Sequence, residues 1–222
     1  VGILPFNFFD DPNDDRLLMN DIFGRVWEAR NNEGNFNPYY LYGTMNSPEK
    51  WEETKENIEG PMTEKYTKMA KKFYRRINKK HKDKIFIAVT NDLAGVFESA
   101  SQGMGFTYYS RMLHKNPKFI KEVHEVIAEF TAACYNAYMD AGAELFIESG
   151  DLAYKTGPMM SPKKFNELLL PAYKTITDAV HDRGKKIVLH TDGHVTPLLD
   201  FVVDCGFDGL HSLEPTAGVD LA

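Results

Sequence analysis

The sequence predicts an α/β protein built on a parallel sheet. The first reason is that short apolar runs alternate with amphipathic helical patterns through the second half of the chain. The second is that these runs are almost continuously apolar, as strands covered on both faces require. The third is that polar residues follow the carboxyl end of each run, which is where parallel α/β proteins place their functional groups.

Four segments of the second half are predicted to be buried parallel strands. Each is short and rich in the β-branched and aromatic residues that fit a pleated sheet. Each is flanked by polar loops and helical patterns, as repeated βα units require. The four segments are residues 84–90, 143–148, Lys186–His190 and 207–211.

The helices between these strands carry explicit start and stop signals. Asn116-Pro117 and Ser161-Pro162 each combine a capping side chain with a proline suited to the first helical turn. Thr196-Pro197 opens a third helix in the same way. Pro171 interrupts the pattern that starts at Ser161, so a kink or two consecutive helices is expected there. Glycines end the three helical stretches, at Gly142, Gly184 and Gly206.

The first half of the chain is less regular. Residues 21–28 and 38–42, joined by an Asn/Gly-rich stretch, predict a small β-hairpin inserted between βα units. Helices over residues 49–59 and 63–78 follow, separated by the breaker Gly60-Pro61. The sequence has no internal repeat and no low-complexity linker, so residues 1–222 are predicted to form a single domain.

Composition and charge are those of an ordinary globular protein. Hydrophobic residues make up 43% and charged residues 26%, which argues against disorder. The net charge of −6 differs from the basic character of nucleic-acid-binding domains. The sequence contains no run of about 18 apolar residues, so it predicts no membrane-spanning helix. Residues 1–6 lack the basic region of a signal peptide. Two cysteines, Cys134 and Cys205, lie on apolar faces, so a reducing, cytoplasmic location is expected.

Polar residues gather at the carboxyl ends of the four predicted strands. Because parallel strands bring these ends to one edge of the sheet, the side chains are expected to face a shared site. The residues are Asn91 and Asp92 after the first strand, Glu148, Ser149, Asp151 and Tyr154 at the second, His190, Thr191, Asp192, Gly193 and His194 at the third, and His211, Ser212 and Glu214 at the fourth.

Several of these residues also have a purely structural interpretation. Asp151 could turn the backbone, and Asp92 could cap a helix. His190 could be a hydrogen-bonded core histidine, and Glu214 could serve only its own loop. Residues that only cap or turn the backbone have no reason to gather at one edge of a sheet, so the convergence of these polar residues favours a functional site.

His190 and Asp192 are candidate metal ligands. Side chains two residues apart on a strand point to the same face, so these two could share one ion. Imidazole and carboxylate together suit zinc, but two ligands do not complete a site. Glu148, Asp151 and His211 are the candidates for a third ligand, and their spacing does not choose between them.

Three motifs of the second half resemble a known superfamily. Residues 150–162 have the sequence G-D-L-A-Y-K-T-G-P-M-M-S-P, followed by Pro171, and His190-Thr191-Asp192-Gly193 comes next. Residues 206–220 add L-E-P and A-G-V-D. These motifs resemble the uroporphyrinogen decarboxylase superfamily, and weaker similarity over residues 21–28 and 95–105 extends the likeness to nearly the whole chain.

The resemblance implies a (β/α)8 TIM barrel and one of two activities. A closed barrel needs eight strands and typically about 250 residues, so with four secure strands the barrel is expected to be incomplete at one or both ends. One activity is cofactor-free decarboxylation of porphyrinogen acetate side chains. The other is methyl transfer to or from a protein-bound corrinoid, with a zinc held by a His-x-Cys pair and a later cysteine. This chain has Asp192 in place of the first cysteine.

The expected function is that of a corrinoid-linked methyltransferase acting on a small methylated or methoxylated substrate. Asp151, His190 and Asp192 are the expected catalytic residues, with zinc at His190 and Asp192 and a corrinoid protein as partner. The alternatives are a uroporphyrinogen decarboxylase of porphyrin biosynthesis, which needs no cofactor, or a non-catalytic barrel subunit; a homodimer is compatible with each. The expected substrate-binding residues are Asn91, Asp92, Glu148, Tyr154, His211 and Glu214.

Overall fold

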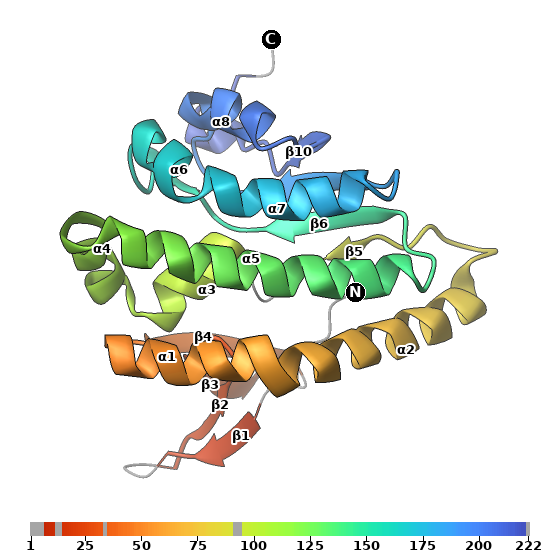
Figure 1. The fold of residues 1–222 in the computed structure, drawn as a ribbon, viewed down its shortest axis with the longest axis horizontal. Helices are drawn as coiled ribbons and strands as arrows, with labels where there is room; N and C mark the ends of the chain where they lie inside the picture. The colour runs from red at the N-terminus through yellow and green to blue at the C-terminus, as the bar shows by residue number, and fades with distance from the viewer. Residues whose placement is uncertain (1–6, 12–14, 33–34, 91–94, 221–222) are drawn as a thin grey trace.

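The structure, a computed structural model, contains over its described residues a four-stranded parallel sheet, a four-stranded sheet that we call the antiparallel sheet, and a two-stranded antiparallel pair. Helices pack against the two larger sheets (Figure 1). It describes residues 7–11, 15–32, 35–90 and 95–220. The antiparallel sheet lies at one end of the molecule in this view, and the last strand of the parallel sheet lies at the other. Over the described ranges, no helix combines the length and apolar character that crossing a membrane would demand.

The parallel sheet consists of consecutive βα units. Its strands are β5 (Val89–Thr90), β6 (Leu145–Ser149), β9 (Lys186–His190) and β10 (Gly209–His211). Their spatial order is β10-β9-β6-β5, so each strand pairs with its neighbour in chain order, and all pairs are parallel. This is the arrangement of successive strands in a (β/α)8 barrel. The described residues form four such strands, and closure into eight stays a prediction.

Long helices cover one face of this sheet. Helix α5 (Pro117–Met139) contacts both α7 (Leu170–His181) and α2 (Thr63–His81), and Figure 1 shows the three running across the molecule in successive layers. The remaining elements of this half are α3 (Val96–Gly103), α4 (Phe106–Lys115), β7 (Ala153–Tyr154), β8 (Gly157–Pro158), α6 (Pro162–Leu168), η2 (Thr196–Leu198), α8 (Leu199–Asp204) and η3 (Pro215–Ala217).

Two of the three capping signals in the sequence act as predicted, whereas Thr196 lies inside η2 and its side chain caps neither η2 nor α8. The side chain of Asn116 accepts a hydrogen bond from the backbone N–H of Phe119 at 3.3 Å, and α5 starts at the following proline. The Ser161 hydroxyl accepts one from Lys164 N at 3.4 Å, where α6 begins. The break expected near Pro171 is also confirmed, because α6 ends at Leu168 and α7 starts at Leu170.

The first predicted parallel strand is shorter than expected. Of residues 84–90, only Val89 and Thr90 pair with β6. Ile85 and Phe86 are 57% and 66% exposed, so the apolar run does not mark a fully buried strand. Within the described part of the chain β5 pairs on one side only, and edge strands are held by fewer backbone hydrogen bonds than central ones.

The predicted β-hairpin belongs to a four-stranded antiparallel sheet. Strands β3 (Arg25–Asn32) and β4 (Asn35–Gly43) form the hairpin, and β1 (Asn7–Asp10) and β2 (Leu17–Asn20) extend it in the order β1-β2-β3-β4. Residues 21–24, predicted to start the first strand, instead form a turn. Helix α1 (Pro48–Asn57) joins α2 through the distorted segment η1 (Ile58–Met62), where the sequence places Gly60-Pro61.

Side-chain alternation along the strands of the parallel sheet separates the face covered by the helices from the opposite face, which we call the outer face. Phe146 on β6 and Ile187 and Leu189 on β9 are fully buried beneath the helices. Their neighbours Ser149 and His190 point to the opposite face of the sheet, because side chains alternate along a strand. The outer face is therefore where polar side chains at the strand ends can meet.

His124 is a buried polar residue in the helical layer. It is fully buried on α5, with Nδ1 2.9 Å from the Leu168 carbonyl oxygen and Nε2 3.1 Å from the Tyr109 hydroxyl. Burial lowers the pKa of His124 to about 4, although the hydrogen bond to Leu168 opposes this shift. A histidine in an unfolded chain titrates near ~6.5. The unfolded state therefore binds more protons than the folded state between these two values.

We expect this histidine to make stability pH-dependent. Its contribution is present above pH ~6.5 and is lost as the pH falls toward the folded pKa, by about 2 kcal/mol between pH 7 and pH 5. Urea unfolding at the two pH values measures this loss. His124→Gln should remove that part of the pH dependence, whereas His114→Gln, at an exposed position on α4, should retain it. An unchanged pH dependence in His124→Gln would contradict the buried neutral imidazole.

Candidate active site at the strand ends

The carboxyl ends of three parallel strands bring polar residues together on the outer face of the sheet. Ser149 of β6, His190 of β9 and His211 of β10 are register partners, so they lie side by side across the strands. The loops that follow these strands carry Asp151, Asp192 and further polar residues. This is the edge at which barrel enzymes hold their reactive groups.

The backbone ties the first two loops to each other. Gly150 N–H donates to the His190 carbonyl at 3.0 Å, and Leu152 N–H donates to the Thr191 hydroxyl at 2.9 Å. Gly193 has a φ of +86°, and a Cβ there would lie 2.4 Å from the Ala153 carbonyl oxygen, so only glycine fits. These contacts hold the loop of Asp151 against the loop of Asp192.

Asp151, His190 and Asp192 form a compact group. Each offers one ligand atom, and these atoms all lie within 4.8 Å of one another. The backbone N–H of Asp192 donates to Asp151 Oδ1 at 3.1 Å, which fixes the two loops at the point where the carboxylates meet. Asp192 is exposed, and the other two are partly buried. We call these three residues the Asp-His-Asp triad.

The imidazole of His190 is oriented by its neighbours. Its Nδ1 lies 2.8 Å from Nδ1 of His211 and 3.1 Å from the Ser212 hydroxyl oxygen. The two rings are tilted by 39° with centroids 5.0 Å apart. One nitrogen of the pair must donate and the other accept. Because Nδ1 is engaged in these contacts, Nε2 is the nitrogen of His190 that is left for a metal or a substrate.

Glu214 closes the neighbouring loop. Its carboxylate accepts hydrogen bonds from Gly193 N–H at 3.0 Å and from the Thr216 hydroxyl at 2.8 Å. The Thr216 and Gly193 hydrogen bonds lower the pKa of Glu214. Glu214 is thereby attached to the residue that follows Asp192. Tyr154 comes from β7; the residue is 55% exposed, and its carbonyl oxygen accepts a hydrogen bond from His194 N–H at 2.9 Å.

Glu148 lies on the other side of the sheet from the triad. Its side chain is fully buried in the helical layer. The carboxylate accepts hydrogen bonds from the Tyr135 hydroxyl at 2.9 Å and from Val96 N–H at 3.3 Å. This position suits attachment of β6 to the helices, and the predicted contact with substrate stays a prediction. Asn91 and Asp92, the other residues expected at the first strand, lie outside the described residues.

The structure adds Glu98 to the neighbourhood of the triad and places Ser212, expected at the fourth strand end, beside both imidazoles. Glu98, on α3, is partly buried and lies close enough to Asp151 and Arg25 for their charges to act on its carboxyl group. Burial raises the pKa of Glu98, the charge of Asp151 raises it further, and the charge of Arg25 opposes the shift. Ser212 has a φ of +66°, which turns its hydroxyl toward both imidazoles. No motif marks Glu98 in the sequence.

The donor set of the triad fits a divalent cation. Two carboxylates and one imidazole supply oxygen and nitrogen ligands of the kind that zinc, manganese and iron accept. Ligating histidines commonly use their second ring nitrogen in a hydrogen bond, as His190 does with His211 and Ser212. The two cysteines do not belong to this set, since Cys205 is buried and burial raises the pKa of Cys134 to about 12.

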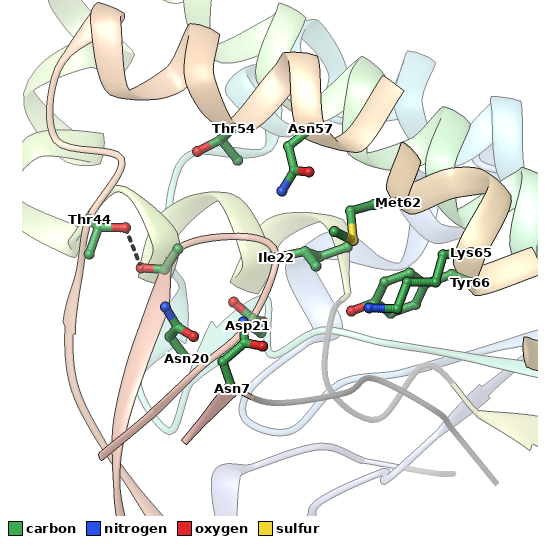
Figure 2. Close-up of a pocket in the computed structure, with 11 residues that line it drawn as sticks. Asn7, Asn20, Asp21, Ile22, Thr44, Thr54, Asn57, Met62, Lys65 and Tyr66 are labelled. Carbon is green, nitrogen blue, oxygen red and sulfur yellow. Dashed lines mark hydrogen bonds between the residues drawn. The ribbon is translucent and has the colours of Figure 1, made fainter. Parts of the chain in front are cut away.

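A separate polar cavity lies between the antiparallel sheet and helices α1 and α2. Figure 2 shows it, with Thr54 and Asn57 on the helix side and Asn20 and Asp21 on the strand side. Its volume is about 240 Å³. Asn20 Oδ1 is buried there without a hydrogen-bond partner among the described residues. None of the triad residues lines this cavity, so it is distinct from the strand-end site.

Comparisons with known proteins identify relatives of the chain. It is 26% identical over 132 residues to "Methylcobamide:CoM methyltransferase MtaA" of Methanosarcina barkeri (strain Fusaro / DSM 804), and 25% identical over 132 residues to the MtaA of Methanosarcina barkeri. These matches cover 60% of this chain and 37% of each relative. The chain therefore spans little more than a third of the length of these curated relatives.

The fold and the family are supported independently. A methyltransferase from Methanosarcina mazei superposes with a TM-score of 0.61 at 18% identity, covering 85% of this chain and 52% of that one, which supports a shared fold. The family model "Uroporphyrinogen decarboxylase (URO-D)" matches residues 38–221, which is most of the sequence. The chain belongs to the uroporphyrinogen decarboxylase (URO-D) family.

Proposed function

We propose that the protein is a corrinoid-linked methyltransferase acting on a small methylated or methoxylated substrate. The observation that carries this proposal is the Asp-His-Asp triad, at the strand-end edge where barrel enzymes bind substrate. The relatives in Methanosarcina barkeri are named for methyl transfer from a methylcobamide, which supports a corrinoid as methyl carrier. The chain covers only part of those relatives, so activity, substrate and partner are all proposals.

The triad suits activation of the atom that carries the methyl group. When the methyl group moves to a reduced corrinoid, the carbon–oxygen or carbon–nitrogen bond breaks, and the oxygen or nitrogen keeps the electron pair and takes up a proton. His190 offers Nε2 for this proton transfer while His211 and Ser212 hold Nδ1. Asp151 and Asp192 stabilise the positive charge that the imidazole carries before it donates the proton.

The same residues could instead hold a divalent cation. Asp151, His190 and Asp192 would be its ligands, with zinc as the first candidate because imidazole and carboxylate suit that ion. When bound, such a cation would act as a Lewis acid on the oxygen or nitrogen of the substrate. Asp192 stands where the methyltransferase branch that binds zinc through a His-x-Cys pair has cysteine, so the proposed site has more oxygen ligands than the site of that branch.

Porphyrinogen decarboxylation is the weaker alternative. A uroporphyrinogen carries eight carboxylates, and holding them requires several cationic groups. The groups that gather around the triad are mostly carboxylates, from Asp151, Asp192, Glu98 and Glu214. Like charges in one site repel, so this neighbourhood favours a cation or a neutral methyl donor over a poly-acid.

Two assays on the purified chain test the proposal. Cobalamin in the cobalt(I) state is incubated with methoxylated aromatic compounds and with methylated amines, and methylcobalamin formation is followed by absorbance, with and without added Zn²⁺. In the reverse direction, methylcobalamin is incubated with a thiol acceptor. We expect protein-dependent methyl transfer in at least one direction. Conversion of uroporphyrinogen to coproporphyrinogen without corrinoid methylation would instead establish the decarboxylase activity.

A further inference from the structure

Thr191 lies between His190 and Asp192 in the chain but faces away from the Asp-His-Asp triad. Its backbone N–H donates to the His211 carbonyl at 3.4 Å, so the pairing of β9 with β10 continues past the last residue of β9. Neighbouring side chains on an extended backbone point to opposite sides. Thr191 is accordingly 1% exposed, whereas Asp192, one residue further, is exposed. Thr191 is therefore buried next to the site and leaves the open side to its two neighbours.

The Thr191 hydroxyl joins the two loops that carry the triad carboxylates. Leu152 N–H donates to Oγ1 at 2.9 Å, and Oγ1 donates to the Asp192 carbonyl oxygen at 3.2 Å. A hydroxyl has one proton to donate and lone pairs with which to accept. Thr191 uses its proton toward one loop and a lone pair toward the other, so an aliphatic side chain of the same shape could replace neither bond.

The backbone N–H of Leu152 depends on this hydroxyl. Leu152 is fully buried, so water does not reach it to replace a lost acceptor. Its carbonyl accepts a hydrogen bond from Met159 N–H at 2.8 Å, which fixes the residue on its other side. A buried donor without an acceptor is costly. Removing the hydroxyl should therefore displace the segment around Leu152 until its N–H finds another partner.

Asp151 stands between two residues that are bonded to the segment of His190 and Thr191. Gly150 N–H donates to the His190 carbonyl at 3.0 Å, and Leu152 N–H donates to the Thr191 hydroxyl. The first bond joins two backbone groups, which almost any type of residue can supply. The second bond requires a hydroxyl side chain at position 191. The place of Asp151 relative to the next strand therefore depends on which residue stands at that position.

We propose that Thr191 is a positioning residue whose hydroxyl holds the Asp151 and Asp192 carboxylates together beside His190. With both loops in place, Asp192 N–H reaches Asp151 Oδ1 at 3.1 Å, and the ligand atoms of the triad lie within 4.8 Å of one another. The purpose of this arrangement rests on the proposed function, since metal binding or proton transfer requires both carboxylates near the imidazole. The geometric part is measurable without any metal or corrinoid.

Amide hydrogen exchange, measured residue by residue by NMR on the full chain, tests this geometric part. Thr191→Val keeps the shape of the side chain and replaces the hydroxyl by a methyl group. We expect exchange to rise about tenfold or more at Leu152 N–H, which loses its acceptor, and at Asp192 N–H, whose carboxylate acceptor moves. Asp208 N–H, bonded to the Ile187 carbonyl at 2.8 Å near the other end of β9, should stay within about threefold of the wild type.

Two variants separate a role at the triad from a general loss of stability. Thr191→Ser keeps a hydroxyl, so the Leu152 and Asp192 amides should exchange nearly as in the wild type. Thr177→Val is the matched control, because Thr177 on α7 is also fully buried and its hydroxyl donates to the Cys205 carbonyl at 2.7 Å. This variant should leave exchange at both amides within about threefold of the wild type.

Co²⁺ titration, followed by visible absorption, adds a functional readout. Affinity should fall about 10-fold or more in Thr191→Val, the lower limit of the range for residues that hold metal ligands in place. It should stay near the wild-type value in Thr191→Ser and in Thr177→Val. Urea unfolding gives the stability of each variant, so that a loss of affinity can be compared with a loss of stability.

Each outcome decides the inference. Wild-type exchange at Asp192 N–H in Thr191→Val, or equal acceleration there in Thr191→Ser or Thr177→Val, would overturn a positioning role. So would a Thr191→Val chain that does not fold although Thr177→Val folds, because the hydroxyl would then serve general stability. If the wild-type chain binds no Co²⁺ and transfers no methyl group, the proposed function fails, and the exchange pattern still judges the role of Thr191.

Discussion

In the variant His190→Ala, the affinity of the protein for Zn²⁺ and Co²⁺ is expected to fall by about 100-fold or more. Removing a residue that only hydrogen-bonds to a metal ligand typically costs about 10- to 100-fold, so the loss of a ligand should exceed that range. His190 supplies the imidazole of the Asp-His-Asp triad, and without it two carboxylates are left. Methyl transfer should fall with the affinity if the cation takes part, and should also fall without added metal if the imidazole donates the proton. Competition with a chelating dye gives the affinities.

Two histidines provide graded controls for this prediction. His211 touches His190 through Nδ1 but is not one of the grouped ligands, so His211→Ala should cost about 10-fold in affinity. His181 is on α7, where its Nε2 lies 2.9 Å from Asp208, and His181→Ala should leave metal affinity unchanged. Wild-type affinity in His190→Ala, or equal losses in all three variants, would contradict metal binding by the triad.

The strand-end arrangement was largely predictable from the sequence. The segment Lys186–His190 is bounded by Gly184 and a polar loop, so its strand is found with the predicted bounds. Once consecutive strands are parallel, their carboxyl ends must share an edge, and the structure brings Asp151, His190, Asp192, His211 and Glu214 to that edge. The functions assigned to these residues stay predictions.

The direction of Glu148 could not be predicted from the sequence. A strand covered on both faces is apolar throughout, so its sequence lacks the alternation that tells the two faces apart. A shift of one residue in the strand moves a side chain from one face to the other. Glu148 precedes Ser149 by one residue, and it lies in the helical layer while Ser149 is the register partner of His190 on the outer face.

Glu98 could not be found from the sequence for a different reason. Its proximity to Asp151 depends on how α3 packs near the end of β6, two elements separated in the chain by the whole of α4 and α5. No local pattern encodes such proximity. Strand β2 was missed because it has only four residues, too few for a clear alternating pattern.

The variant Arg25→Ala is expected to lower the free energy of unfolding by about 3–5 kcal/mol, the range for removing one partner of a buried ion pair. Arg25 Nη2 and Nε lie 2.7 Å and 2.8 Å from Asp21 Oδ2, and the two side chains are 4% and 0% exposed. The guanidinium also lies over the Trp27 ring, 4.8 Å from its centroid. Without Arg25, the carboxylate of Asp21 stays buried without its cation.

Arg30, on the same strand β3, is the matched control. It also pairs with a carboxylate, Glu28 at 2.8 Å, and also lies over an aromatic ring, Tyr39 at 4.4 Å, but its side chain is 45% exposed. Exposed pairs contribute about 0–1 kcal/mol, so Arg30→Ala should cost no more than this. Urea unfolding at neutral pH measures the free energy of unfolding of both variants.

Since the two arginines differ mainly in burial, equal losses would mean that the desolvation of Asp21 does not determine the cost of removing Arg25. A large loss in Arg25→Ala alone would identify the buried pair as the anchor of the turn that joins β2 to β3.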